Sequence, residues 1–176
     1  MANDQPQEQW LKWVALTTTI LAVCAAIASL KGSSFSTRVQ ILTTQENNQW
    51  SYFQSKSIKQ HLFELKRDIF QIELAKDPAP ALRARLLDMI KGVDDSIVRY
   101  DKEKEEIRLQ AEALSKEQVD LKRHGGNFGI AVMLFQIAIM LSAVGALLKK
   151  RYAWLAGLLM GFFGLLYFAN GFWTFF

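Results

Sequence analysis

The side chains that most often carry chemistry in proteins are few and scattered in this sequence. Two histidines, His61 and His124, stand 63 residues apart, without a nearby cysteine or a pair of carboxylates, and this is not the spacing of a metal site. The acidic residues Glu103, Glu105 and Glu106 are typical of a solvated helix face. No residue is placed as a nucleophile on a strained turn beside an oxyanion hole. We therefore expect no catalytic residue, no metal and no cofactor, and interpret the chain as non-enzymatic.

A second feature that could bind a partner is the polar stretch of residues 43–50. It lacks the apolar seam that the flanking turns have, and aromatic residues follow it. A helix that is polar all round is either exposed or packed against a polar partner. Because aromatic side chains are favoured in interface cores, one hypothesis is an oligomer or partner contact anchored by Trp50, Tyr52 and Phe53. The alternative, an exposed and locally weak helix, stays open.

The elements that would position these residues follow from the distribution of charge. Residues 31–125 hold 17 Lys and Arg and 15 Asp and Glu, out of 21 and 17 in the whole chain. Such a balanced mixture is typical of a solvated helical surface, whereas a nucleic-acid binder has an unbalanced basic face. We therefore expect a charged helical domain between apolar flanks, and no nucleic-acid partner.

Three uncharged segments lie outside this domain, over residues 13–30, 128–148 and 152–176, and they are 18, 21 and 25 residues long. About 20 apolar residues suffice for a helix to cross a bilayer. The sequence predicts a short polar N-terminus (1–12), transmembrane helices over 13–30, 126–148 and 152–176, and a basic loop at 149–151. The first segment could instead be a cleaved signal peptide, but residues 1–11 lack a basic n-region, which favours a retained anchor in the lipid bilayer.

The second and third apolar segments must form an antiparallel hairpin, because only three residues join them. Small residues recur at helical spacing on both, and such residues let two helices approach closely in lipid. The predicted packing residues are Ala138, Ser142, Gly145, Gly157, Gly161 and Gly164. Glycine is also common in membrane helices generally, and that alternative stays open.

The charged domain (31–125) is predicted to be a second, longer hairpin. Prolines at Pro78 and Pro80 end a helix over about 37–76, and a second helix follows over about 81–123, with the turn at 77–80. Apolar residues on the first helix alternate in steps of four and three: Ile58, Leu62, Leu65, Ile69 and Ile72. The second helix continues the alternation over Leu86, Ile90, Val93, Ile97, Tyr100, Lys104, Ile107, Ala111, Leu114, Gln118 and Leu121. This spacing predicts a coiled-coil-like seam, in which facing residue numbers sum to about 157.

Several stretches of the chain resemble a known family. They are residues 16–32, with ILAV at 20–23 and SLKG at 29–32; residues 48–59, NQWSYFQSKSIK; and residues 167–173, YFANGFW. They resemble the bacterial membrane family catalogued as domain of unknown function 4337, over essentially the whole chain. The resemblance implies a protein of the bacterial inner membrane. It implies no activity and no functional residue.

Taken together, these patterns predict an all-α membrane protein with three transmembrane helices and a long helical hairpin between the first and the second. Because a two-helix hairpin has too little core for all its apolar residues, we expect a self-associating scaffold, a homo-oligomer of three or more copies. The alternative is a pore or transport component formed by the oligomer, lined by Thr17, Thr18, Thr19 and Gln136. No charged residue lies inside the apolar segments, which argues against ion-coupled transport.

The sidedness of the hairpin rests on the positive-inside rule. Short loops with Lys and Arg stay cytoplasmic, so the loop at 149–151 predicts a hairpin on the periplasmic side. Lys31, Arg38 and Lys122 near the ends of the hairpin argue for the opposite orientation, which stays open.

Overall fold

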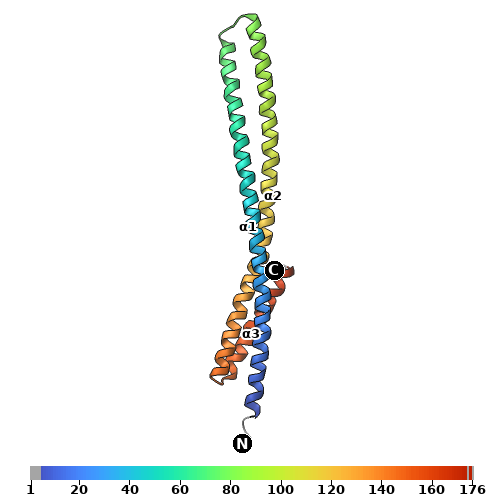
Figure 1. Ribbon diagram of the computed structural model, residues 1–176, viewed down its shortest axis with the longest axis vertical. Coiled ribbons are helices and arrows are strands. Elements are labelled where there is room, and N and C mark those ends of the chain that lie inside the picture. The colour runs from blue at the N-terminus through green and yellow to red at the C-terminus, as the bar shows by residue number, and fades with distance from the viewer. Residues whose placement is uncertain (1–4, 174, 176) are drawn as a thin grey trace. The chain divides into compact units, whose positions relative to one another are not determined.

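The computed structural model describes residues 5–173 and 175, and in them it contains three α-helices and no strand. Helix α1 runs over Gln5–Ala75, α2 over Pro80–Leu147 and α3 over Arg151–Trp173. The helices form two compact units (Figure 1). We call the described residues of Met1–Gln40 and Gln118–Phe176 the terminal unit, and Ile41–Glu117 the central unit.

Local sequence explains where each helix begins and ends. Asp77 has a φ of 53° and precedes Pro78, and both features stop α1. Pro80 then begins α2, at a position where a missing N–H costs nothing. Helix α2 ends at Leu147 and is followed by a left-handed residue, Lys149, with a φ of 52°. The N–H of Lys150 donates to the carbonyl of Gly145 at 3.0 Å, a contact of the Schellman type that closes the helix end.

The helices do not break where the sequence changes from apolar to charged. The sequence predicts separate helices over 13–30 and about 37–76, and over about 81–123 and 126–148, but α1 and α2 both continue through these junctions and through Gly32 and Gly125. A glycine costs a helix interior only about 1 kcal/mol, and close packing around these two glycines offsets that cost.

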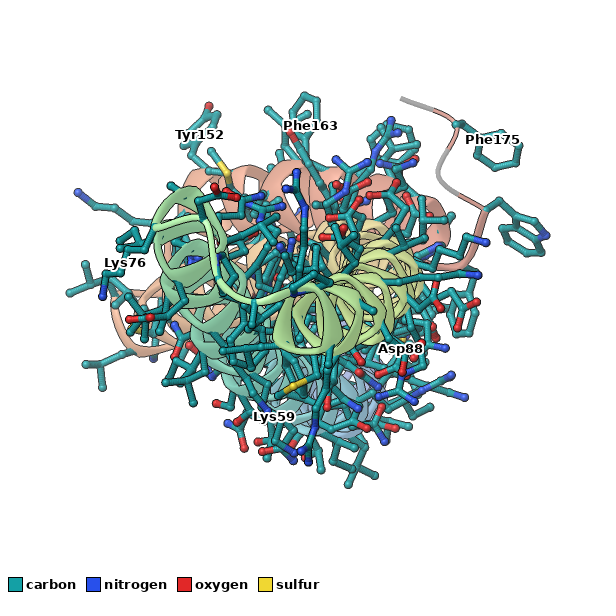
Figure 2. All side chains as sticks on the ribbon, turned by 90° about the horizontal axis from the view of Figure 1, so that it is seen from above. Lys59, Lys76, Asp88, Tyr152, Phe163 and Phe175 are labelled. Carbon is teal, nitrogen blue, oxygen red and sulfur yellow. The ribbon has the colours of Figure 1, made fainter. Side chains whose placement is uncertain are left out.

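The terminal unit packs the N-terminal part of α1 against the C-terminal part of α2 and against α3. Its core consists of Leu21, Ala28, Phe128, Ala131, Phe135 and Ala138. All three helices contain a stretch that is long and apolar enough to cross a membrane. The outer surface of this unit is largely apolar too: Tyr152 and Phe163 point away from the helices (Figure 2).

In the central unit, α1 and α2 lie side by side and antiparallel, joined by the turn at residues 76–79 (Figure 1). Its buried apolar residues lie on α2, at Leu86, Val93, Ile107 and Ala111. Charged side chains such as Lys76 extend from the outside of the pair (Figure 2).

Candidate functional site

The two histidines make structural contacts. His61 Nδ1 lies 2.8 Å from a carboxylate oxygen of Glu64 on the same helix. His124 Nδ1 lies 2.9 Å from the carbonyl oxygen of Gly171, to which it must donate, and its ring stacks on Phe35 at 5.4 Å between centroids. Within residues 5–173 and 175, no group of three or more His, Cys, Asp or Glu could hold a metal ion. The contact surfaces of the described helices are the other candidate functional features.

The contact between α2 and α3 is closed by small residues. Glycines at 157, 161 and 164 are buried on α3. Gly157 faces Ala138 and Ser142 of α2, Gly161 faces Leu21 of α1 and Ala138, and Gly164 faces the ring of Phe135. A Cβ placed on Gly157 would lie 2.6 Å from the Ser142 Oγ and 2.7 Å from the Ala138 carbonyl oxygen. On Gly145 it would lie 2.8 Å from the backbone nitrogen of Trp154. The structure thus places all six small residues named from the sequence at one close helix–helix contact, which only side chains of this size permit.

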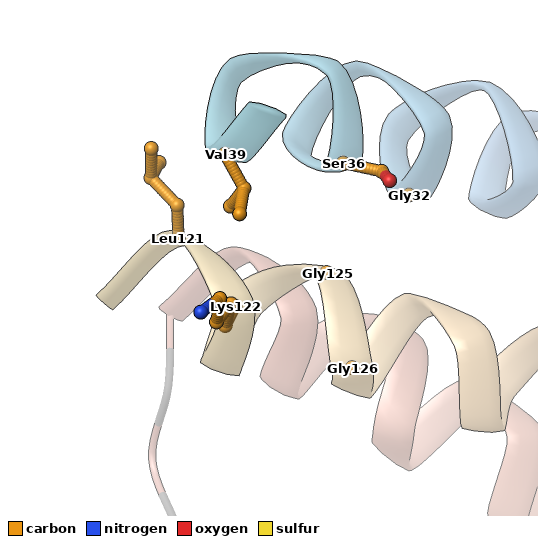
Figure 3. Close-up of a pocket in the computed structure, with 7 residues that line it drawn as sticks. All are labelled: Gly32, Ser36, Val39, Leu121, Lys122, Gly125 and Gly126. Carbon is orange, nitrogen blue, oxygen red and sulfur yellow. The ribbon is translucent and has the colours of Figure 1, made fainter. Parts of the chain in front are cut away.

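A second close approach joins α1 and α2 in the terminal unit. A Cβ on Gly32 would lie 3.4 Å from that of Phe128, and one on Gly125 would lie 3.3 Å from that of Phe35. The rings of Phe35 and Phe128 stack at 5.8 Å. Beside this crossing lies a groove of about 260 Å³, lined by Gly32, Ser36, Val39, Leu121, Lys122, Gly125 and Gly126 (Figure 3).

Aromatic packing at the two ends of the terminal unit was not anticipated from the sequence. Phe128 is fully buried against Phe168 and Phe172, at 5.9 and 5.0 Å between ring centroids. The spacing of Phe128 and Phe135 could have predicted this packing, because residues seven positions apart lie on one helix face. At the other end, the Trp154 Nε1 donates to Thr17 Oγ1 at 3.2 Å.

The seam of the central unit combines apolar residues of α2 with polar and aromatic residues of α1. Lys56 Nζ donates to Glu103 Oε2 at 2.6 Å, and Lys104 Nζ donates to Gln60 Oε1 at 2.8 Å. The Phe63 ring packs on Tyr100 at 5.6 Å. These contacts give facing residue numbers that sum to 159–164, in place of the 157 expected from the turn.

The ion pair between Lys56 and Glu103 in this seam shifts the pKa values of both groups. The hydrogen bond from Lys56 holds the pKa of the Glu103 carboxyl below its ordinary value, and the same bond raises the pKa of the Lys56 amine. Both groups are charged at neutral pH and hold α1 and α2 in register at this level. Their position is partly exposed, so the pair specifies alignment more than it stabilises.

The apolar stripe predicted to be the α1 half of the seam faces outward, and this prediction is wrong. The exposed fractions are 62% for Ile58, 60% for Leu62, 58% for Leu65, 49% for Ile69 and 61% for Ile72. We call these five residues the outer stripe. The face that meets α2 carries Phe53, Lys56, Gln60, Phe63, Arg67 and Phe70 instead. The reason is that charged groups on α2 lie opposite this face and bond to its long polar side chains, as in the 3.7 Å contact between Arg67 and Asp94.

The α2 half of the predicted seam lies against α1. Leu86, Val93 and Ile107 are buried, and Ile90, Ile97 and Leu114 are half-buried. The apolar face of α2 thus packs within the chain, while the apolar face of α1 does not.

The aromatic residues after the polar stretch do not form one outward patch. Phe53 is half-buried in the seam, with the Lys104 amine 5.3 Å from its ring centroid. Trp50 packs edge-on against Phe53 at 5.7 Å and donates to Glu46 at 3.3 Å. Only Tyr52 faces outward, at 52% exposed. A partner contact through all three at once therefore stays a prediction that this arrangement does not favour.

Comparison with known proteins gives one finding, a match to a family model. No curated protein and no solved structure matches the chain. The family model described as Domain of unknown function (DUF4337) matches residues 10–174. With nearly the whole length matched, the chain belongs to this family.

Proposed function

We propose that this protein is a non-enzymatic scaffold of the bacterial inner membrane that self-associates through its central unit. The three apolar helical stretches of the terminal unit support insertion into a bilayer. The contact between α2 and α3, which is lined by glycines, also supports insertion, because small residues promote helix packing in lipid, where burial of apolar surface gives no driving force. The bacterial location follows from the family resemblance.

The observation that carries self-association is the outer stripe. Each of its five residues is about half exposed or more, although the spacing of four and three is that of a coiled-coil seam. Together they leave on the order of 500 Å² of apolar surface on each copy, at the upper end of what soluble monomers expose. Two copies meeting there would bury about 1,000 Å², enough for a specific interface.

The residue types of the outer stripe do not by themselves select a number of copies. In heptad terms Leu62 and Ile69 occupy a positions, and Ile58, Leu65 and Ile72 occupy d positions. Leucine at a with isoleucine at d shifts parallel coiled coils toward trimers and tetramers, whereas isoleucine at a with leucine at d favours dimers, and the stripe contains both combinations. Copies inserted in one membrane suit a parallel assembly, and the exposed apolar residues outside the stripe, such as Leu82 and Leu109, lead us to propose three copies or more.

The test is a native mass measurement in mild detergent. We expect wild-type protein to give the mass of a trimer or larger, and the variant Leu62→Gln/Ile69→Gln to give a monomer. The matched control is Leu87→Gln/Val98→Gln, two similarly exposed positions on α2 outside the stripe, which should leave the assembly intact. A monomeric wild type would refute the proposal.

A second candidate function is a pore formed by the same assembly. Its support is Gln136, which lies in the middle of the apolar stretch of α2 and is exposed. The other candidate lining residues, Thr17, Thr18 and Thr19, give the pore weaker support, because their hydroxyls all donate to carbonyls of their own helix. Replacing these four residues with leucine should leave conductance unchanged for a scaffold and alter it for a pore.

The basic loop favours a periplasmic central unit. Lys149, Lys150 and Arg151 directly join two apolar stretches, and short loops of this kind stay cytoplasmic. In a Cys24→Ala background, an impermeant thiol reagent applied to intact spheroplasts should label Ala79→Cys in the exposed turn. Labelling only after membrane rupture would reverse the orientation.

A further inference from the structure

The amide of Gln136 lies at the centre of the longest uncharged part of α2. The nearest charged residues along the helix, Arg123 and Lys149, are each 13 residues away, which corresponds to about 20 Å of helix on either side. In a bilayer with an apolar core about 30 Å thick, Gln136 would lie near the midplane. From there its side chain is too short to reach water.

The face of α2 that carries Gln136 is not used within the chain. The residues on it follow the same alternation of three and four: Gly126, Gly129, Met133, Gln136 and Met140. Met133 and Met140 are each 59% exposed, and a Cβ on Gly126 or Gly129 would meet nothing within 4 Å. The opposite face holds Phe128, Ala131, Phe135 and Ala138, all fully buried.

The side chain of Gln136 makes no hydrogen bond within the part of the chain that the structure describes, whereas hydroxyl groups in the apolar stretches of the terminal unit do. The Ser142 hydroxyl donates to the Ala138 carbonyl at 2.8 Å, and the Thr19 hydroxyl donates to the Ala15 carbonyl at 2.8 Å. The Gln136 amide carries two N–H donors and an acceptor oxygen. Lipid tails satisfy none of these, so an unpaired amide at the midplane is strongly unfavourable.

We propose that Gln136 is the centre of a second contact between copies of this chain, inside the membrane. The inference rests on the membrane insertion and self-association put forward under Proposed function. The same amide on a second copy offers an acceptor for the Gln136 donors and donors for its oxygen. Symmetry-related copies can therefore satisfy one another's Gln136 amides around the axis of the assembly. Gly126 and Gly129 let a neighbouring helix approach closely, and the flexible Met133 and Met140 side chains fill the space on either side of the amide.

The composition of this face favours a protein neighbour over a water-filled path. Gln136 is its single polar side chain between Gly126 and Met140, and apolar residues flank it one turn away in both directions. A water path requires polar groups in succession along the pore, and α2 supplies one. A buried amide–amide contact requires one alone.

The contact is tested by cysteine cross-linking of the full-length chain in membranes. In a Cys24→Ala background, Gln136→Cys should form disulfide-linked dimers on treatment with a membrane-permeant oxidant. The matched control is Phe163→Cys, which is exposed on α3 at the same depth, because its neighbour Gly164 packs on Phe135. We expect several-fold more dimer at position 136 than at position 163.

The contribution of the amide itself is measured by substitution. Gln136→Leu should raise the apparent dissociation constant of the assembly about 3- to 20-fold, the range for one hydrogen bond between membrane helices. Gln136→Asn should restore much of the affinity, because it keeps the amide.

The possible outcomes separate this contact from self-association as a whole. An assembly of normal mass in which position 136 cross-links no better than position 163 would overturn the Gln136 contact and leave the outer stripe standing. A monomeric, uncross-linked chain would overturn both. Gln136→Leu that assembles normally but alters conductance would replace the contact with a water path.

Discussion

Leucine-to-alanine substitution at three positions of the central unit tests which apolar surface is internal and which is shared between copies. Leu86 is 7% exposed and belongs to the seam, Leu87 is 51% exposed and lies outside both surfaces, and Leu65 is 58% exposed and belongs to the outer stripe. The three changes remove the same atoms. Their effects should therefore differ only through what surrounds each side chain.

The expected magnitudes follow from exposure. Leu86→Ala should lower the free energy of unfolding by about 2–5 kcal/mol at any protein concentration. Leu87→Ala should change it by no more than about 0.5 kcal/mol. Leu65 leaves on the order of 100 Å² for a neighbouring copy to bury, which is worth about 2.5 kcal/mol. Since alanine recovers a small part of this, Leu65→Ala should cost about 2 kcal/mol for each contact, or about a thirtyfold weaker association.

The assay is thermal unfolding by circular dichroism, repeated over a hundredfold range of protein concentration in one detergent. Wild type should melt at a temperature that rises with concentration, because association stabilises the folded chain. Leu65→Ala should need a roughly thirtyfold higher concentration to reach the same melting temperature. If Leu65→Ala behaves like Leu87→Ala, the outer stripe is merely solvated and the reasoning fails.

Three further predictions concern the seam, the α2–α3 contact and the turn. The hydrogen bond from Lys56 holds the pKa of Glu103 in the folded chain below its ordinary value of 4.5. On acidification the Glu103 carboxyl is therefore protonated in the unfolded chain before it is protonated in the folded chain. The stability that the Lys56–Glu103 pair contributes is present above pH 4.5 and is lost as the pH falls below it. The melting temperature of Glu103→Gln should accordingly be lower than that of wild type at about pH 6, and the gap should narrow as the pH is lowered below 4.5. The Cβ of Gly157→Ala would lie 2.7 Å from a backbone oxygen, so this change should destabilise the chain by about 1–3 kcal/mol in denaturant titration. The Cβ of Gly92→Ala would meet nothing within 4 Å, so this control should stabilise the chain by about 0.5–1 kcal/mol. Equal effects of the two changes would contradict the packing argument. Asp77→Gly should raise the melting temperature slightly, because glycine adopts a φ of 53° without the strain of a Cβ; a lower melting temperature would show that the Asp77 side chain, 3.4 Å from Arg83, matters more.

Much of the architecture could be predicted from local sequence. The Asp77-Pro78 stop and the Pro80 start place the turn between α1 and α2 to within a residue. Apolar length identifies the three helices that could cross a membrane. Spacing also identified the buried face of α2, because that face has a single apolar stripe.

The α1 half of the seam could not be predicted in the same way, because α1 carries two stripes with seam-like spacing. One is aliphatic, the outer stripe, and the other mixes Phe53, Phe63 and Phe70 with Lys56 and Gln60. A prediction from the spacing of apolar residues alone therefore places the outer stripe in the seam. The structure uses the second, since Glu103 and Lys104 of α2 bond to Lys56 and Gln60 across the seam.

What the sequence determines by itself is what depends on near neighbours along the chain: helix formation, helix ends and the apolar character of each face. What the tertiary structure decides is which of several apolar faces meets which partner. Ion pairs and hydrogen bonds between α1 and α2 join residues far apart along the chain, from 27 positions for Arg67 and Asp94 to 47 for Lys56 and Glu103. A close approach such as that of Gly157 to Ser142 exists only once two helices have packed. The outward direction of Gln136 and of the outer stripe follows from those choices, because a helix that commits one face to a partner must turn the opposite face away from it.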